Sequence, residues 1–418
     1  MKPHSVIVAA HALLSLASPS ATHRDQPKYD IRPFRIDLDH GVPRMLDLVR
    51  EARLPERPEY PSLGDSAGID LDVLKGLREE WLNSFDWPKE QASMNDFKHF
   101  TVQIEGLKIH FIHEKAADPS AIPLILAHGW PGSFLEFAPI IRNLTQQANT
   151  STNKSTSFNV VVPSLPGFAF SSPPPANWTI DDTARVYNTL MTDVLGYKTF
   201  AVFGTDWGSG PSYSLYNNFN ATTRAAHFAF VPFLPKTVDA LKVDDNITLT
   251  SAEAFEEAES ETWLTTGQGY FGEQTTDPNT LGLALYDNPV GQLAWIGDKY
   301  IDYSDPRAGT GVSLVTHNEI LREVSLYYLT RSFLSSVFIY SQNKADGFKQ
   351  NYVKANTDAP MLFSAFKYNI AFWPPQLVSK VGNLVLYHNH DFGGHFPGID
   401  NPPALLADLR EIGNYWLE

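Results

Sequence analysis

The stretch FAVFGTDWG, residues 200–208, decides the fold of this chain. It begins with four apolar residues, as a buried strand does, and Gly204 and Gly208 stand on either side of the turn that follows. A strand that turns sharply into a helix requires small residues at these two positions, because a side chain there would collide with neighbouring backbone. Such a turn directs its central side chain out of the sheet, and here that side chain is Asp206. We therefore predict that Asp206 faces a substrate as a nucleophile.

The identity of this central residue determines the chemistry, since an aspartate stands where a serine is usual. A carboxylate that attacks carbon forms an alkyl ester, which suits strained or activated alkyl electrophiles. The alternative is an ordinary aspartate that caps the following helix. A second motif, HGWPGS at residues 128–133 directly after the apolar run 122–127, favours the nucleophile. The backbone N–H groups of Trp130 and Trp207 are then the expected donors of an oxyanion hole.

The composition restricts the class of protein. The chain of 418 residues is long enough for a large core, and its hydrophobic content of 43% is ordinary for a globular protein. The formal net charge of −15 argues against nucleic acid or an anionic membrane as a partner. The chain has no cysteine, which excludes disulfides, thiol chemistry and cysteine-ligated zinc.

Residues 1–17 have the features of a secretory signal peptide. Lys2 and His4 precede an apolar run that is too short to span a bilayer easily, and small residues near Ala17 suit cleavage. The alternative is a flexible N-terminal arm. Acceptor motifs for N-glycosylation, which support export, begin at Asn143, Asn149, Asn153, Asn177, Asn220 and Asn246. We therefore expect a secreted glycoprotein, or one of the secretory-pathway lumen, with no stable membrane anchor.

The alternation of strand and helix patterns predicts an α/β protein with a parallel sheet. Residues 18–96 are polar, punctuated by proline and helical in periodicity, so we expect a helical arm there. The first part of the α/β core is expected over residues 97–232, a helical lid over 233–355 and the second part of the core over 356–418. The expected strands lie at 97–104 and 107–112, which form a hairpin, and at 122–127, 158–162, 200–203, 226–231, 361–364 and 383–387.

A general base is expected on a late loop, after the last strand. The segment 391–397, DFGGHFP, supplies His395, and its two glycines allow the loop to bend toward the end of the sheet. The nearby His388 and His390 could instead form a metal site with His395. No carboxylate or further histidine stands at a recognisable ligand spacing, so we expect the base and no metal.

Together these motifs resemble the microsomal-type epoxide hydrolases of the α/β-hydrolase superfamily. The resemblance covers roughly residue 30 to the C-terminus, and it is carried by segments 81–87, 128–137, 162–168, 204–209, 293–300 and 393–396. It implies a mostly parallel eight-stranded sheet with an inserted helical lid and an N-terminal helical arm. It also implies an enzyme that works without a cofactor.

The resemblance implies roles for three further residues. The family uses two lid tyrosines that donate hydrogen bonds to the epoxide oxygen, and by position these are Tyr270 and Tyr340. Phenols suit this role because the leaving alkoxide is strongly basic. The family's acid, which orients the histidine, aligns with Asn369, so a neutral amide stands in its place. Asp391 and, less directly, Asp358 are alternative acids.

We therefore expect an epoxide hydrolase that converts an epoxide and water to a vicinal diol through a covalent aspartyl ester. Its expected partner is a small apolar epoxide, on account of the many aromatic residues in the lid. Two alternatives remain at this point. One is a hydrolase of another alkyl electrophile, such as a dehalogenase. The other is a slow or silent binding protein of the same fold, because Asn369 cannot stabilise an imidazolium as a carboxylate does.

Overall fold

The fold is built around one large twisted sheet. A computed structural model of the protein describes residues 28–344 and 347–416. The strand order of the sheet is β1-β2-β3-β7-β4-β8-β9-β10-β11. The bounds are β1 Arg32–Phe34, β2 His99–Ile104, β3 Leu107–Glu114, β4 Ile122–Ala127, β7 Phe158–Pro163, β8 Phe200–Gly204, β9 Thr223–Phe228, β10 Pro360–Tyr368 and β11 Asn383–Gly394. From β7 to β11 every neighbouring pair is parallel, whereas the pairs from β1 to β7 are antiparallel. The expected mostly parallel sheet is confirmed.

Several details of the expected sheet were wrong, among them the position of β9, which spans Thr223–Phe228 and not residues 226–231. Within the described residues the sheet has nine strands rather than eight, because β1 of the N-terminal arm pairs antiparallel with β2. The last strand is longer than expected: β11 continues past Tyr387 to Gly394, so His388, His390 and Asp391 lie on a strand and not on a loop. Since β11 is an edge strand with many half-exposed side chains, its polar second half lacked the hydrophobic pattern that predicts strands.

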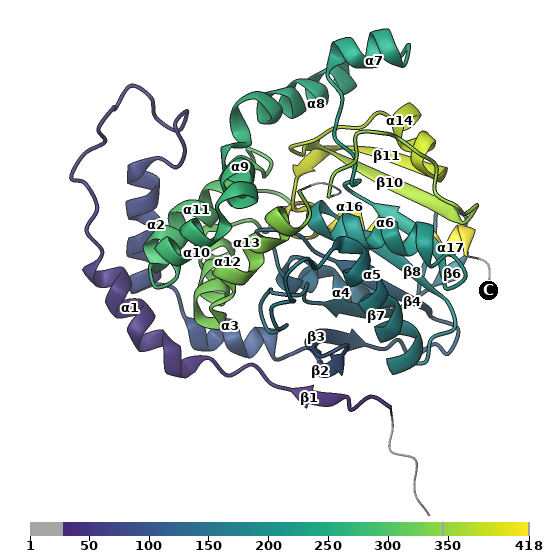
Figure 1. Cartoon of the computed structure of the whole chain (residues 1–418), viewed down its shortest axis with the longest axis horizontal. Helices are drawn as coiled ribbons and strands as arrows, with labels where there is room; N and C mark the ends of the chain where they lie inside the picture. Colours follow the sequence, from purple (N-terminus) through teal and green to yellow (C-terminus); the bar gives the residue numbers. More distant parts are fainter. Residues whose placement is uncertain (1–27, 345–346, 417–418) are drawn as a thin grey trace, which may run out of the picture.

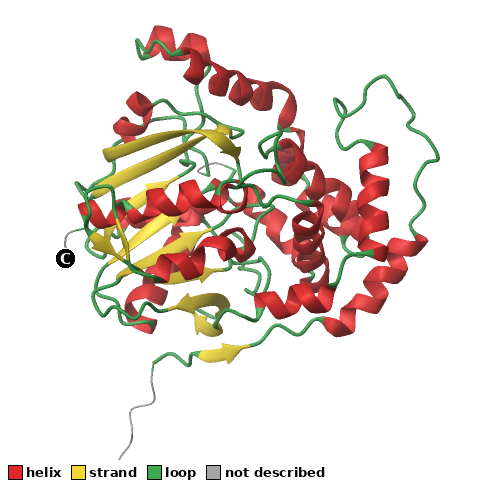
Figure 2. Cartoon of the chain, turned by 180° about the vertical axis from the view of Figure 1, so that it is seen from behind, coloured by secondary structure: helices red, strands yellow, loops and turns green. Residues whose placement is uncertain are grey.

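Helices cover both faces of the sheet, as Figures 1 and 2 show. Helices α5 (Ile180–Thr189) and α6 (Ser209–Asn218) pack together, and α4 (Ala138–Thr145) packs with α16 (Pro402–Arg410). Successive side chains of β8 pack on opposite faces of the sheet. Val202 belongs to one hydrophobic cluster, and Ala201 and Phe203 belong to the other. The central strands are therefore buried on both sides, which explains their continuous apolar runs.

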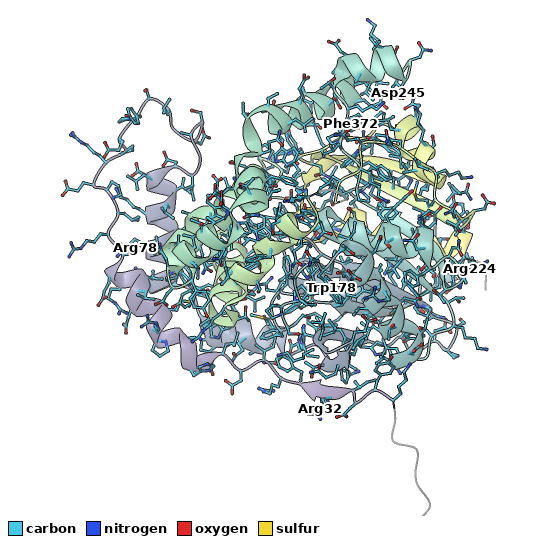
Figure 3. The ribbon with its side chains drawn as sticks, in the orientation of Figure 1. Arg32, Arg78, Trp178, Arg224, Asp245 and Phe372 are labelled. Atoms are coloured by element: carbon cyan, nitrogen blue, oxygen red, sulfur yellow. The ribbon has the colours of Figure 1, made fainter. Side chains whose placement is uncertain are left out.

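The N-terminal arm consists mainly of three helices after β1. These are α1 (Val42–Glu51), α2 (Leu71–Asn83) and α3 (Trp87–Met94). Asp70 and Asp86 cap the second and third by accepting hydrogen bonds from the first-turn amides. Arg78 of α2, labelled in Figure 3, donates to the backbone oxygens of Val49 and Arg50 at the end of α1. The indole of Trp81 donates to Ser325 of α12, so the arm is fastened to the helices that follow β9.

Seven α-helices of the described chain lie between β9 and β10. They are α7 (Val238–Asp244), α8 (Ser251–Thr262), α9 (Gly269–Thr276), α10 (Pro278–Leu285), α11 (Pro289–Asp302), α12 (His317–Thr330) and α13 (Ser332–Gln342). In Figure 1 the green helices α9–α13 stand beside one end of the sheet, whereas α7 and α8 extend past the edge formed by β10 and β11. Helix α13 packs against α9 and α10. This packing therefore brings Tyr270 of α9 and Tyr340 of α13 close to each other. We call this group of helices the lid.

The remaining elements are short. They are η1 (Asp39–Gly41), η2 (Phe134–Phe137), the two-stranded hairpin β5 (Ala148–Asn149) and β6 (Ser155–Thr156), η3 (Leu190–Val194), η4 (Asp206–Gly208), η5 (Trp263–Gly267), α14 (Pro375–Val381), α15 (Pro397–Asp400) and α17 (Ile412–Tyr415). In the described part of the chain, no helix combines the length and the apolar character needed to cross a bilayer. The expected signal peptide, residues 1–17, lies outside the described residues.

Candidate active site

The candidate site lies where four parallel strands end. Trp130 follows β4, Asp206 follows β8, Asn369 follows β10 and His395 follows β11. Because the carboxyl ends of parallel strands meet at one edge of a sheet, residues far apart in the sequence converge there. The lid helices α9 and α13 add Tyr270 and Tyr340 from the other side.

Asp206 occupies a strained turn between β8 and α6. Its φ is 44°, a left-handed conformation that non-glycine residues rarely adopt and that is often found at functional sites. The turn is packed closely: a Cβ on Gly208 would lie 2.2 Å from the carbonyl oxygen of Ala127, and one on Gly129 would lie 2.0 Å from Asp206 Oδ1. The sequence therefore keeps glycine where the turn and the neighbouring loop touch.

The two oxygens of the Asp206 carboxylate have different surroundings. Oδ1 accepts a hydrogen bond of 2.7 Å from the backbone N–H of Trp130, and Oδ2 lies 3.3 Å from Nε2 of His395. The side chain does not cap a helix: the N-cap residue of α6 is Gly208, and no side-chain capping bond is found there. Among the described residues, the N–H of Trp207 makes no hydrogen bond to this carboxylate. Of the two expected oxyanion donors, the N–H of Trp130 is therefore already hydrogen-bonded to the carboxylate of Asp206.

His395 is held by backbone and amide groups. Its Nδ1 lies 2.8 Å from Oδ1 of Asn369, whose Nδ2 donates to the carbonyl oxygen of Ala229. That second bond fixes the orientation of the amide, so Oδ1 must accept the proton of Nδ1. The backbone N–H of His395 donates to the carbonyl oxygen of Tyr303. The Nε2 lone pair is consequently directed at Asp206, where a base that activates water would stand.

The alternative acids do not contact the histidine in the structure. Asp391 lies on β11, and its backbone oxygen accepts a hydrogen bond from Arg307. Asp358 pairs with Lys354, and its side chain is 94% exposed. The structure thus places Asn369, and neither of these carboxylates, against Nδ1 of His395.

The two lid tyrosines face Asp206 across a pair of tryptophans. The ring of Tyr270 stacks on Trp130 at 5.5 Å, and the ring of Tyr340 meets Trp207 edge-on at 4.8 Å. Both phenols are buried, and burial raises the pKa of each well above 10. They are therefore protonated at neutral pH. Within the described chain, the hydroxyl of Tyr340 has no hydrogen-bond partner, so it is available to a substrate.

Comparison with known proteins assigns this arrangement to a family. Residues 31–137 match the family model of the epoxide hydrolase N terminus, and residues 122–233 match the α/β-hydrolase fold. A protein of Stigmatella aurantiaca is 34% identical over 91% of this chain and 84% of its own length. Epoxide hydrolase 1 of Sus scrofa is 31% identical over 91% of this chain and 88% of its own. The chain belongs to the epoxide hydrolase family.

Solved structures agree with this assignment. The epoxide hydrolase of Aspergillus niger has a TM-score of 0.78 and 32% identity, and the match covers 93% of this chain and 97% of that one. The juvenile hormone epoxide hydrolase of Bombyx mori, at 24% identity and a TM-score of 0.81, shows the shared fold. The expected α/β-hydrolase fold and epoxide hydrolase activity are both confirmed. This chain is an enzyme that hydrolyses small-molecule epoxides.

A small cavity in this epoxide hydrolase adjoins Asp206. Its volume is about 50 Å³. Apart from Asp206 and the lid tyrosines, its walls are mainly apolar and aromatic: Trp207, Phe230, Leu234, Pro235, Trp263, Gln268, Phe271, Phe348 and Ile370. Asp206, Tyr270 and Tyr340 thus line a small, mainly apolar space with little room for water, which strengthens electrostatic interactions there.

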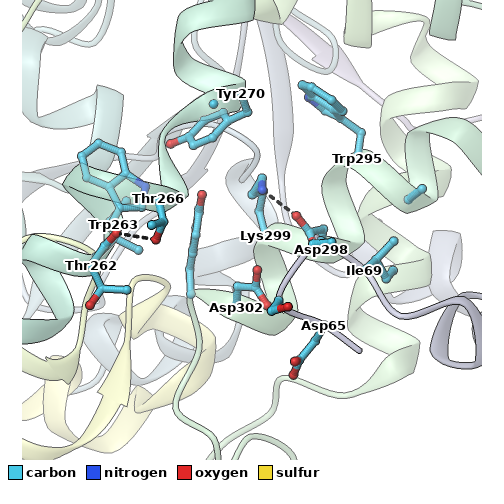
Figure 4. Close-up of a pocket in the computed structure, with 18 of the residues that line it drawn as sticks. Asp65, Ile69, Thr262, Trp263, Thr266, Tyr270, Trp295, Asp298, Lys299 and Asp302 are labelled. Atoms are coloured by element: carbon cyan, nitrogen blue, oxygen red, sulfur yellow. Dashed lines mark hydrogen bonds and ion pairs between the residues drawn. The ribbon is translucent and has the colours of Figure 1, made fainter. Parts of the chain in front are cut away.

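A larger cavity of about 900 Å³ lies on the other side of Tyr270. Trp263, Tyr270 and Ile370 line both cavities and so form the wall between them. Figure 4 shows Lys299 paired with Asp298 near Tyr270, with Asp302 and Asp65 close by. Burial raises the pKa of Asp302 to about 6. Carboxylates outnumber cationic groups in this lining, which disfavours anionic molecules.

Several residues of the site were not predicted from the sequence. Tyr303 binds the backbone of His395 and packs edge-on against its ring, and Phe230 packs against the same ring. Two buried carboxyls were also not predicted: burial raises the pKa of Glu136, which also interacts with the charge of Asp206, far above 4.5, and burial raises the pKa of Glu323 to about 8. Glu136 lies within segment 128–137, one of the segments that carry the family resemblance, and this was the only sign in the sequence that it belongs to the site.

Proposed function

We propose that this epoxide hydrolase opens its substrate by covalent attack of Asp206. The observation that carries the proposal is the difference between the two carboxylate oxygens: Oδ1 is bound by the N–H of Trp130, whereas Oδ2 lies 3.3 Å from Nε2 of His395. The same side chain lines the small cavity. Oδ2 attacks an epoxide carbon, the carbon–oxygen bond of the ring breaks, and an ester forms. A phenol of the lid, Tyr340 or Tyr270, gives a proton to the departing alkoxide.

Hydrolysis of this ester then requires the base. His395 takes a proton from water through Nε2, and the water oxygen attacks Cγ of Asp206. The negative charge that develops on Oδ1 is stabilised by the N–H of Trp130, with that of Trp207 as the second expected donor. The Cγ–Oδ2 bond breaks, the imidazolium returns its proton to the departing oxygen, and the vicinal diol leaves. The proton released when Asp206 ionises again restores the phenol.

The lining of the two cavities supports an apolar epoxide as the substrate. The reacting centre is surrounded by aromatic rings, which bind apolar groups well, and the larger cavity offers room for a bulky remainder. The acidic groups of the larger cavity disfavour substrates that carry a carboxylate. Initial rates with matched epoxides, one ending in an alkyl group and one in a carboxylate, test this: the proposal requires the alkyl form to react faster.

Tyr340→Phe is expected to slow ester formation by about a hundredfold or more, because the alkoxide loses a positioned proton donor. Tyr270→Phe is expected to act in the same direction, and neither change should slow ester hydrolysis as much. Single-turnover experiments that follow tryptophan fluorescence measure both steps, since Trp130 and Trp207 contact these rings. Tyr187→Phe is the matched control: this buried hydroxyl also lacks a partner in the described structure but lies on α5. Unchanged alkylation in both lid variants would move the donor role elsewhere.

The enzyme is expected to accumulate its covalent ester during turnover. Asn369 orients His395 but cannot stabilise the imidazolium, so ester hydrolysis is slow relative to ester formation. Asn369→Asp should therefore speed release of the ester by about tenfold. The gain is limited because the carbonyl of Ala229 faces Nδ2 and would repel a carboxylate oxygen there. Intact-protein mass spectrometry after rapid mixing with an epoxide measures the adduct. If Asp391→Asn slows release while Asn369→Asp changes nothing, the role of Asn369 is refuted.

We also propose that the protein passes through the secretory pathway. The acceptor residues Asn143, Asn149, Asn153, Asn177 and Asn246 are exposed, as glycosylation requires. Protein recovered from its native route should begin near Ser18 and lose mass when treated with a glycosidase. An unglycosylated product that retains Met1 would contradict the proposal.

A further inference from the structure

A second cluster of chemically active side chains lies outside the catalytic site, where β11 meets α16. His388 and His390 alternate along β11 and therefore point to the same face of the strand. Asp408 of α16 lies against both: its Oδ1 is 2.6 Å from Nδ1 of His388, and its Oδ2 is 2.6 Å from Nε2 of His390. The three potential ligand atoms lie within 4.8 Å of one another. Two imidazoles and a carboxylate thus converge on one point.

We propose that His388, His390 and Asp408 form a binding site for Zn²⁺, with solvent as the fourth ligand. Imidazole nitrogen and carboxylate oxygen are ligands that zinc prefers, and three protein ligands with a water complete a tetrahedral site. The side chain of His388 is 42% exposed and that of His390 is 21% exposed, so water and an ion can reach the cluster. The carboxylate is 4% exposed and provides a fixed anchor.

Neighbouring groups hold this anchor in place. The hydroxyl of Ser364 donates to Oδ2 of Asp408, and Nε2 of His227 contacts the same hydroxyl at 2.8 Å. The ring of His390 stacks on Phe366, which limits its rotation. Hydrogen bonds of this kind behind a ligand are typical of metal sites, because they fix the ligand's orientation. The anchor therefore has the support that a metal ligand needs.

An ion can enter by a small rearrangement. The inner nitrogens, Nδ1 of His388 and Nε2 of His390, are hydrogen-bonded to the carboxylate of Asp408. The outer nitrogens, Nε2 of His388 and Nδ1 of His390, have no protein partner in the described part of the chain. Each ring can carry its proton on this outer nitrogen and turn its inner lone pair toward the ion. Bonds of about 2.0–2.1 Å in a tetrahedron separate ligand atoms by roughly 3.3 Å. Each nitrogen must therefore move away from its carboxylate oxygen by less than about 1 Å, and any pair that is now 4.8 Å apart must move closer by roughly 1.5 Å. The exposed ring of His388 is free to make most of that movement.

The site is separate from the catalytic histidine. His395 comes directly after β11, but its Nε2 faces Asp206 and its Nδ1 faces Asn369. The sequence suggested His388, His390 and His395 as a metal set, and the structure replaces His395 by Asp408 from a later helix. A bound ion would tie α16 to the strand that carries the base. We therefore expect zinc to raise the thermal stability of the enzyme.

Titration of the untagged enzyme with zinc tests the site. After treatment with a chelator and its removal, calorimetric titration with ZnCl₂ should show one ion bound per chain. A zinc concentration about a hundred times the Kd should raise Tm by a few degrees. Co²⁺ in place of zinc should give visible absorption bands of a protein-bound, low-coordinate ion. These three measurements require no substrate and are independent of the catalytic mechanism.

Two ligand variants and one control decide the outcome. His388→Gln and His390→Gln should each weaken zinc binding by about a hundredfold or more and remove the shift in Tm. The His317→Gln variant should bind zinc as the unaltered enzyme does, because His317 pairs with Glu80 at the surface and takes no part in the proposed site. Absence of binding to the unaltered enzyme would overturn the proposal. So would zinc binding that survives both ligand variants, or that is lost equally in the control.

Discussion

Asp206→Asn is expected to abolish diol formation, with a loss in kcat of about 10⁴ or more, as is usual when a covalent nucleophile is removed. An amide is a poor nucleophile, and its nitrogen cannot form the ester from which the diol is released. The fold should persist, because the change is isosteric and the strained turn depends on the backbone and its glycines. Product formation from an epoxide, measured over many turnovers, gives the result.

This experiment needs two controls. Asparagine next to a small residue or in a strained turn can deamidate back to aspartate, so the mass of the purified variant must be verified. A thermal unfolding transition close to that of the unaltered enzyme establishes that the fold is intact. Multiple turnovers by a variant that passes both checks would remove Asp206 from its proposed role.

His395→Gln is expected to lower steady-state diol production by about 10²–10⁴, because water at the ester loses its base. The two steps should separate: ester formation continues, and the ester then persists. Intact-protein mass spectrometry should show one substrate mass added to nearly every chain, and peptide mapping should place it on Asp206. The double variant with Asp206→Asn should show no adduct. Rapid turnover by His395→Gln, or an adduct on another residue, would contradict the mechanism.

The parts of the fold that sequence analysis predicted are those with a strong local pattern. The buried runs of β4 and β8 and the glycine-flanked turn at Asp206 could be recognised because a parallel strand covered on both faces is apolar throughout. Strand β1 was missed, since it has three residues, none buried, and is defined only by its pairing with β2. Strand β9 lies at Thr223–Phe228 rather than three residues later, because the apolar segment continues beyond it into a buried loop.

In the candidate site, too, the residues with a local sequence pattern were predicted, and those defined only by contacts between distant segments were missed. Asp206, His395 and the lid tyrosines follow recognisable motifs, and Asn369 was located by counting from the next strand; the structure brings all of them together. Tyr303 and Asp408 were missed. Their contacts with His395 and with His388 join segments that are far apart in the sequence, and no local pattern signals such a contact.

The central claim is that Asp206 attacks the epoxide, and a single turnover in ¹⁸O-labelled water tests it most directly. If the ester is cleaved at Cγ of Asp206, the new oxygen of the first diol comes from the unlabelled carboxylate, and the ¹⁸O is found in the peptide that contains Asp206. With enzyme in excess over the epoxide, we therefore expect a diol without ¹⁸O and a protein with one ¹⁸O atom. A first-turnover diol that already contains ¹⁸O would show that water attacks the epoxide itself, and that Asp206 is not the nucleophile.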